Sequence, residues 1–183
     1  GALGPDAAAA VPALIAHVEV SDWETVCHTA RALGEIGREA RAAVPVLVKK
    51  LRAEVYTERE AAAVALGGIG CASEEVVRGL IERLKDFPVR EEAAEALRQL
   101  GPAAKTALLS LIALGTDTKA PPGHQDAALR ALGAVGTADD NVLGALIGLV
   151  RGRQAVRLLV RAEALTTLAE VREGSRGVLP LLV

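Results

Sequence analysis

Apolar positions along this 183-residue chain repeat with a period of about 33 residues, and each period has two parts. The first part is the motif Ala-Leu-Gly-x-Ile-Gly or a close variant of it. In the second part an apolar residue is followed three and four positions later by two more, as in Val44, Leu47 and Val48. Such spacing places side chains on one stripe of a helix, so each period predicts two amphipathic helices. The motif copies lie at residues 32–37, 65–70, 96–101 and 131–136, with a degenerate copy at 164–169.

Short signals predict where these helices begin and end. The Gly that closes each motif is expected to end the first helix, because a left-handed residue without a Cβ satisfies the last carbonyl groups. Ser21 with Glu24, and Thr57 with Glu60, have the spacing of capping boxes at the starts of first helices. Five prolines are expected where helices start or bend: Pro12, Pro45, Pro88, Pro102 and Pro180.

A helix with one apolar stripe cannot bury it alone, so neighbouring pairs are expected to stack around a continuous core. Small residues three positions before the motif Leu would let the helices approach closely; they are Ala30, Ala63, Ala94 and Ala162. The predicted leucine spine of the second helices consists of Leu14, Leu47, Leu80, Leu111 and Leu146. The sequence thus predicts an all-α, right-handed solenoid of about five and a half two-helix repeats, with residues 1–183 forming one array.

Residue types within the period indicate which repeat family this is. The Ala-Leu-Gly-x-Ile-Gly ending, followed by Ala-Val-Pro-Val-Leu at residues 43–47, resembles the short HEAT-like repeats of the phycobilisome-lyase type. Tetratricopeptide and ankyrin arrays have similar periods, but their aromatic knobs and Thr-Pro-Leu-His turn are missing from this sequence. The resembled family includes scaffolds, adaptors and a few chromophore lyases. The resemblance therefore implies a binding function, with a subunit of a bilin-lyase-like enzyme as the alternative.

Two features depart from the regular pattern. The segment 115–123 contains two prolines and two glycines and predicts a bulging loop, either a partner contact or a tolerated surface insertion. The chain contains no Met, and neither end has the polar capping helix that a solenoid needs. We therefore expect these residues to be a segment of a longer protein, or their apolar ends to meet a partner.

Composition excludes several classes of function. With 21 basic and 23 acidic residues, the net charge of −2 gives no general attraction to nucleic acid or to anionic membranes. Trp23 and Tyr56 fall near the starts of first helices, where a core or staple role is expected. No apolar run reaches the roughly 20 residues needed to span a bilayer. We expect a soluble, cytoplasmic protein.

Residues that could support catalysis are few and scattered. His17, His28 and His124 lie on three different repeats and none adjoins a Glu, so no metal site is expected. Cys27 and Cys71 are 44 residues apart and are expected to be reduced thiols in the core. The sequence has no phosphate-binding loop and no nucleophile turn. We therefore predict no enzyme activity, no cofactor and no small-molecule substrate.

The resemblance implies that the second helices line the concave face of the solenoid and that the acidic first helices form the convex face. On the second helices, exposed positions near the leucine spine are mainly basic in the N-terminal half and apolar beyond it. This pattern predicts a partner peptide or protein surface that is acidic and then apolar; the alternative is a merely solvated face. The predicted contact residues are His17, Lys49, Lys50, Arg52, Arg78, Glu82, Arg83, Leu114 and Leu149.

Overall fold

A computed structural model describes residues 5–20, 22–117, 119–136, 144 and 147–148, and in these residues the regular structure is entirely helical. The α-helices are α1 (Pro5–Ala8), α2 (Val11–Val20), α3 (Trp23–Ile36), α4 (Val44–Lys50), α5 (Tyr56–Ile69), α6 (Glu74–Arg83), α7 (Arg90–Leu100), α8 (Leu108–Thr116) and α9 (Pro122–Val135). Three 3₁₀ segments connect them: η1 (Gly37–Ala43), η2 (Phe87–Val89) and η3 (Gly101–Ala107).

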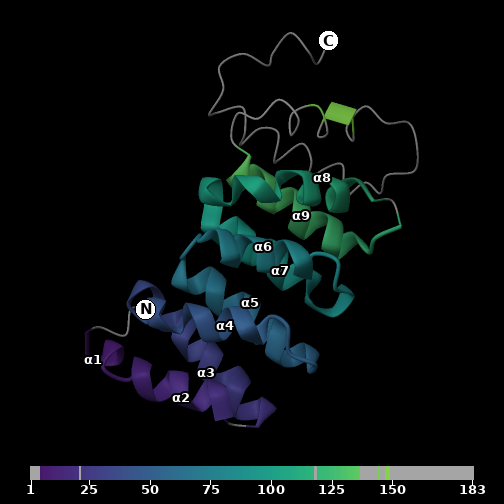
Figure 1. The fold of residues 1–183 in the computed structure, drawn as a ribbon. Helices are drawn as coiled ribbons and strands as arrows, with labels where there is room; N and C mark the ends of the chain where they lie inside the picture. The colour runs from purple at the N-terminus through teal and green to yellow at the C-terminus, as the bar shows by residue number, and fades with distance from the viewer. Residues whose placement is uncertain (1–4, 21, 118, 137–143, 145–146, 149–183) are drawn as a thin grey trace.

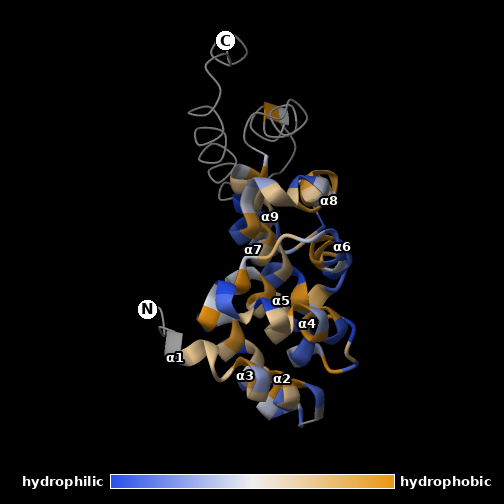
Figure 2. Cartoon of the chain, turned by 60° about the vertical axis from the view of Figure 1, so that its left-hand side comes forward, coloured by the Kyte–Doolittle hydropathy of each residue, from blue (hydrophilic) through white to orange (hydrophobic). Residues whose placement is uncertain are grey.

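The helices form two layers, which Figures 1 and 2 show from two sides. The first helices of the period, α3, α5, α7 and α9, make one layer, and α2, α4, α6 and α8 make the other. Three complete pairs, α3/α4, α5/α6 and α7/α8, thus lie between α2 and α9. The prediction of an all-α solenoid of paired helices is confirmed. The motif at 164–169, Leu146 and Pro180 lie outside the described residues.

Glycines end the first helices as the motif predicts. Gly37, Gly70 and Gly101 follow α3, α5 and α7 with φ angles of 76°, 68° and 60°. Their backbone N–H groups donate back to carbonyl groups of the last helical turn, which would otherwise lack partners. Pro45 lies in the first turn of α4, also as expected. The motif therefore sets the length of each first helix.

The predicted capping boxes at the starts of α3 and α5 are wrong. Asp22, rather than Ser21, is the N-cap of α3, and its carboxylate accepts from the backbone N–H groups of Glu24 and Thr25 at 3.1 Å. The residue before α5 is Val55, which provides no side-chain cap. Thr57 lies inside that helix, and its buried hydroxyl has no hydrogen-bond partner among the described residues.

Two rows of leucines fill the space between the layers. Leu47, Leu80 and Leu111 of the second helices are fully buried, while Leu14 is partly buried against the same core. The motif leucines of the facing layer are buried as well; they are Leu33, Leu66, Leu97 and Leu132. The predicted spine is therefore confirmed wherever the structure describes it.

The first helices approach one another much more closely than the second helices do. A Cβ atom added to Gly68 of α5 would lie 2.6 Å from the carbonyl oxygen of Gly34 in α3. One added to Gly34 would lie 2.9 Å from Cα of Ala65. The second helices α2, α4 and α6 meet along much shorter lengths. Small motif residues thus allow backbone contact in one layer only.

Unequal spacing curves a stack toward its tighter layer. The first helices, with their acidic side chains, therefore lie on the inner side of the curve, and the second helices lie on the outer side. The expectation that the second helices line the concave face is wrong. It failed because the Ala and Gly residues of the motif bring the first helices closest together.

The bulging loop predicted at residues 115–123 is wrong too. Helix α8 continues to Thr116, and the connection to α9 spans residues 117–121. This is the same length as the connection from α4 to α5, residues 51–55. Gln125 of α9 holds the connection in place by donating to the carbonyl oxygen of Asp117 at 2.6 Å.

We predict that Gly68→Ala destabilises the stack, because its methyl group would press on the backbone of α3. Overpacking of this kind typically lowers the free energy of unfolding by about 1–3 kcal/mol. Thermal denaturation followed by circular dichroism measures the change. Gly144→Ala is the control, since a Cβ atom at that helical position would meet no atom within 4 Å. Equal melting temperatures for the two variants would contradict the close contact.

Candidate protein-binding surface

A furrow with a volume of about 480 Å³ opens on the second-helix layer, where α4 faces α2 and α6. We name it the α4 furrow. Three of the predicted contact residues, Lys49, Lys50 and Arg52, line it together. Val46 and Val48 add apolar surface. Because the second helices are spaced apart, the stack leaves this hollow between them, and it presents both charged and apolar groups.

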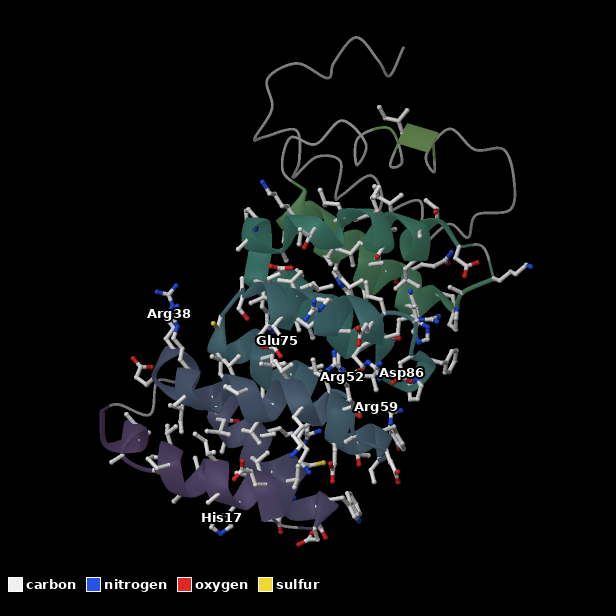
Figure 3. All side chains as sticks on the ribbon, in the orientation of Figure 1. His17, Arg38, Arg52, Arg59, Glu75 and Asp86 are labelled. Carbon is white, nitrogen blue, oxygen red and sulfur yellow. The ribbon has the colours of Figure 1, made fainter. Side chains whose placement is uncertain are left out.

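The charge of the α4 furrow is balanced, although the sequence predicted a basic surface. Its lining includes three carboxylates, which come from α2, from the connection to α5 and from α6: Glu19, Glu54 and Glu75. Arg52 and Glu75 are labelled in Figure 3. Reading along one helix missed these acids, because they belong to neighbouring elements that only the folded chain brings to α4.

Several of the predicted cations already have partners. The ammonium group of Lys50 lies 2.9 Å from the carboxylate of Glu58, and both side chains are mostly buried. Arg52 lies 3.6 Å from Glu82 in a more exposed pair. Among the described residues, Lys49 and Arg78 are exposed and take part in no ion pair. These two cations are therefore the ones available to a partner.

Arg83 belongs to a network that fixes the turn between α6 and α7. Asp86 accepts from Arg83 at 3.2 Å and from Arg59 at 2.7 Å. Arg59 also donates to the carbonyl oxygens of Ala53 and Glu54, at 2.9 and 2.7 Å. Figure 3 shows Arg59 and Asp86 beside each other. Arg83 and Glu82 line a shallow hollow of about 400 Å³ at this turn. Because Arg83 already pairs with Asp86, it helps to hold the fold whether or not a partner binds.

A second furrow, of about 300 Å³, lies where α6 meets α8, and we name it the α8 furrow. Ile81, Leu84 and Leu114 provide most of its apolar lining, and its charged groups are Lys85, Arg90 and Asp117. Leu114, one of the predicted contact residues, is buried and forms part of the furrow wall. The second-helix layer is thus charged near α4 and more apolar near α8.

His17 and Leu149 are the remaining predicted contact residues. His17 is exposed on α2, and its Nδ1 atom lies 2.8 Å from the carbonyl oxygen of Ala13. Figure 3 shows His17 at the far end of the stack, pointing away from Arg52 and Glu75. The fold therefore does not bring His17 to the furrows. Leu149 lies outside the described residues.

The aromatic residues are not in the core, although a core or staple role was expected for Trp23 and Tyr56. Trp23, Tyr56 and Phe87 are 52%, 50% and 61% exposed. Trp23 and Tyr56 are the first residues of α3 and α5, and Phe87 lies three residues before α7. All three therefore lie outside the part of each first helix that carries the buried motif leucine. A signal for this position existed in the sequence. Each aromatic lies ten residues before a motif leucine, namely Leu33, Leu66 or Leu97.

The two cysteines are free and stand apart. Cys27 and Cys71 are partly buried against the core rather than inside it. The Cys27 thiol lies 3.3 Å from the carbonyl oxygen of Thr57 and donates to it. Burial raises the pKa of the Cys27 thiol above its ordinary value, which keeps it protonated and weakly reactive.

No group of three or more His, Cys, Asp or Glu side chains with the geometry of a metal site occurs in the part of the chain that the structure describes. In the same residues, no helix has both the length and the apolar character needed to cross a membrane.

His124 is buried at the start of α9 against residues of the preceding repeat. The ring of Phe87 contacts it edge-on at a centroid distance of 4.8 Å. Arg90 lies 3.4 Å from Nδ1 and Glu91 lies 3.6 Å from Nε2. Burial lowers the pKa of His124 below its ordinary value of 6.5, and Arg90 acts in the same direction while Glu91 opposes it. His124 is therefore held in its neutral form.

Comparison with known proteins agrees with this geometry. Residues 58–86 and 89–117 each match the PBS lyase HEAT-like repeat family, which confirms the resemblance. No curated protein sequence matches the chain significantly.

Several solved structures share the fold. A designed armadillo repeat protein in complex with the peptide (KR)4 is 18% identical, with a TM-score of 0.70 over 89% of this chain and 82% of that chain. The complex of CpcE and CpcF of phycocyanin lyase from Nostoc is 23% identical, with a TM-score of 0.66 over 87% and 98%. An engineered protein is 24% identical, with a TM-score of 0.65 over 91% and 85%.

We predict that His124 makes the protein less stable in mild acid. Below pH 6.5 the unfolded chain takes up a proton at this residue while the folded chain does not, so stability falls as the pH drops from about 7 toward the lowered pKa. Melting temperatures between pH 7.5 and 5.5 measure this slope. His124→Gln should flatten it, whereas His28→Gln, at an exposed site, should not. An unchanged slope in His124→Gln would refute the assignment.

Proposed function

The central repeats of this chain belong to the PBS lyase HEAT-like family, and we propose that the chain is a non-catalytic scaffold module that binds a protein partner along its second-helix layer. The α4 furrow carries this proposal. It is a hollow of about 480 Å³ with buried valines at its base and charges at its rim. An apolar centre with a polar rim is the usual composition of a protein interface.

The exposed cations of the second-helix layer and the α8 furrow together suit a partner segment that is acidic and then apolar, while the balanced charge of the α4 furrow lining adds no net attraction. Lys49 and Arg78 are the exposed cations of α4 and α6, and a carboxylate of the partner would pair with them. Further along the same layer, Ile81 and Leu84 of the α8 furrow offer apolar contact. Lys50 and Arg83 contribute less, since a partner would have to break their existing ion pairs.

Structural relatives give general support for a protein partner. The designed armadillo protein was solved with a peptide, and CpcE and CpcF form a complex of two proteins. Solenoids of this kind present long continuous surfaces because each repeat adds one more pair of helices. A scaffold function needs only such a surface and no reactive groups.

The likeness to CpcE and CpcF favours one second candidate, a subunit of a bilin-lyase-like enzyme. An assay that follows the covalent addition of a tetrapyrrole to an acceptor protein, with and without this chain, tests it. We expect no acceleration by the chain. Chromophore transfer that depends on the chain would establish the enzymatic alternative and overturn the assignment as a non-catalytic scaffold.

We predict that Lys49→Glu combined with Arg78→Glu weakens partner binding about tenfold, a loss of about 1.4 kcal/mol. Binding is measured with defined fluorescent peptides of an acidic block followed by a leucine-rich block. Arg41→Glu combined with Lys105→Glu is the matched control, because it makes the same charge change at exposed sites in η1 and η3 rather than on α4 and α6.

Both double variants should melt like the wild type, since all four side chains are exposed and unpaired among the described residues. Equal affinity of the two double variants for the peptide would contradict the furrow assignment. Equal binding of peptides with and without the acidic block would contradict it as well.

A further inference from the structure

All three aromatic residues of the chain stand where a first helix begins or just before it, and we call them the aromatic row. Trp23, Tyr56 and Phe87 lie ten residues before the motif leucines 33, 66 and 97, so they occupy the same position in successive repeats. Pro122 has this position before Leu132. Each aromatic side chain is at least half exposed. Large exposed aromatics in one register form a pattern that core packing does not require.

A row of carboxylates runs beside this aromatic row, one helical turn further along. The residues four positions after Tyr56, Phe87 and Pro122 are Glu60, Glu91 and Asp126. Side chains four positions apart are neighbours on a helix surface. In α3 the residue four positions after Trp23 is Cys27, which is not acidic. The carboxylate nearest to Trp23 in the sequence is that of Glu24. Tyr56 and Glu60 are neighbours on α5 in this way. Phe87 instead lies in η2, before α7 begins at Arg90, and both Phe87 and Glu91 contact His124.

The carboxylates form a negative surface that internal cations neutralise only in part. Burial raises the pKa of Glu92, and the nearby charges of Glu60 and Glu91 raise it further, so the carboxylates of α5 and α7 repel one another. Arg31 lies 3.3 Å from Glu60, but its side chain is 55% exposed. Ion pairs this exposed contribute little, so a competing cation can replace Arg31.

One aromatic ring of the row already contacts a cation. The guanidinium carbon of Arg90 lies 5.9 Å from the centre of the Phe87 ring, within the range of a cation–π interaction. Arg90 also donates to the carbonyl oxygen of Leu84 at 2.7 Å, which fixes its position. A cation from a partner would find the same kind of contact at Tyr56, with Glu60 beside it.

We propose that the first-helix layer binds an extended protein segment that carries Arg or Lys at every third residue. Each cation would lie against an aromatic ring of one repeat, near the shared negative charge of Glu60, Glu91 and Glu92. Packed helices are about 8–10 Å apart, and three residues of a polyproline-type segment span about 9.3 Å, so one turn of the segment matches one repeat. This surface goes beyond the proposed function, since it lies at the starts of the first helices and selects the opposite charge.

Trp23 provides a direct readout, because it is the single tryptophan of the chain and is half exposed. The probes are three peptides: four repeats of Arg-Pro-Pro, four repeats of Arg-Pro, and four repeats of Glu-Pro-Pro. We expect Arg-Pro-Pro to shift the Trp23 emission to shorter wavelength and to bind more weakly as the salt concentration rises. Equal binding of Arg-Pro, which has the same charge but closer spacing, would overturn the repeat match. Equal binding of Glu-Pro-Pro would overturn the charge assignment.

Variants locate the binding site on the row. Tyr56→Ser and Phe87→Ser should each weaken Arg-Pro-Pro binding about threefold to tenfold, the range of a cation–π contact. Glu60→Gln combined with Glu91→Gln should weaken it by a similar factor. Leu109→Ser is the matched control, because it removes a 74% exposed apolar side chain from α8 in the other layer. Unchanged affinity in the row variants, with native melting curves, would refute the proposal.

A second copy of the chain is the competing occupant of the row. Sedimentation of the wild type and of Tyr56→Ser distinguishes it. We expect a single species whose mass does not differ between the two proteins. A dimer that Tyr56→Ser dissociates would mean that the aromatic row is a self-association surface and would overturn the proposal. The sedimentation and Arg-Pro-Pro results do not depend on whether the Lys49 and Arg78 variants lose binding of the acidic peptides. Each proposal can therefore be refuted without the other.

Discussion

Direct backbone contact between neighbouring first helices is the constraint on which the rest of the structure depends. Gly34 and Gly68 meet where a single added methyl group would collide with the opposite backbone. Alanines along the same helices are fully buried. Close approach increases the number of dispersion contacts that each helix makes, which compensates for the small size of the side chains. A stack almost free of aromatic residues in its interior is possible only because the helices come this close.

The spacing of the two layers follows from that contact. The second helices α2, α4 and α6 contact one another less and stand further apart. Furrows therefore open on the outer layer. Connections between the layers have to be held by side chains. Arg59 does this between α5 and Asp86, where it satisfies two carbonyl oxygens as well as the carboxylate.

Charged residues divide into those that hold the fold and those that remain for a partner. Lys50, Arg59 and Arg83 lie in mostly buried pairs, whose loss would leave an uncompensated charge. Lys49 and Arg78 are exposed on the outer layer, and Glu91 is half exposed on the inner one. The two layers thus present different chemistry, with mixed charge and apolar furrows on one side and aromatic rings beside carboxylates on the other.

The sequence by itself determined the repeat, the pairing of helices, the glycine ends of the first helices and the buried leucines, because these depend on periodicity and local backbone preference. It also brought Lys49, Lys50 and Arg52 together correctly, since they lie on or just after one helix. Only the tertiary structure decided which layer is inner, because curvature depends on the relative spacing of two sets of helices. It likewise decided that Glu19 and Glu75 balance the furrow and that Trp23 is exposed, since contacts between repeats have no signature within a single repeat.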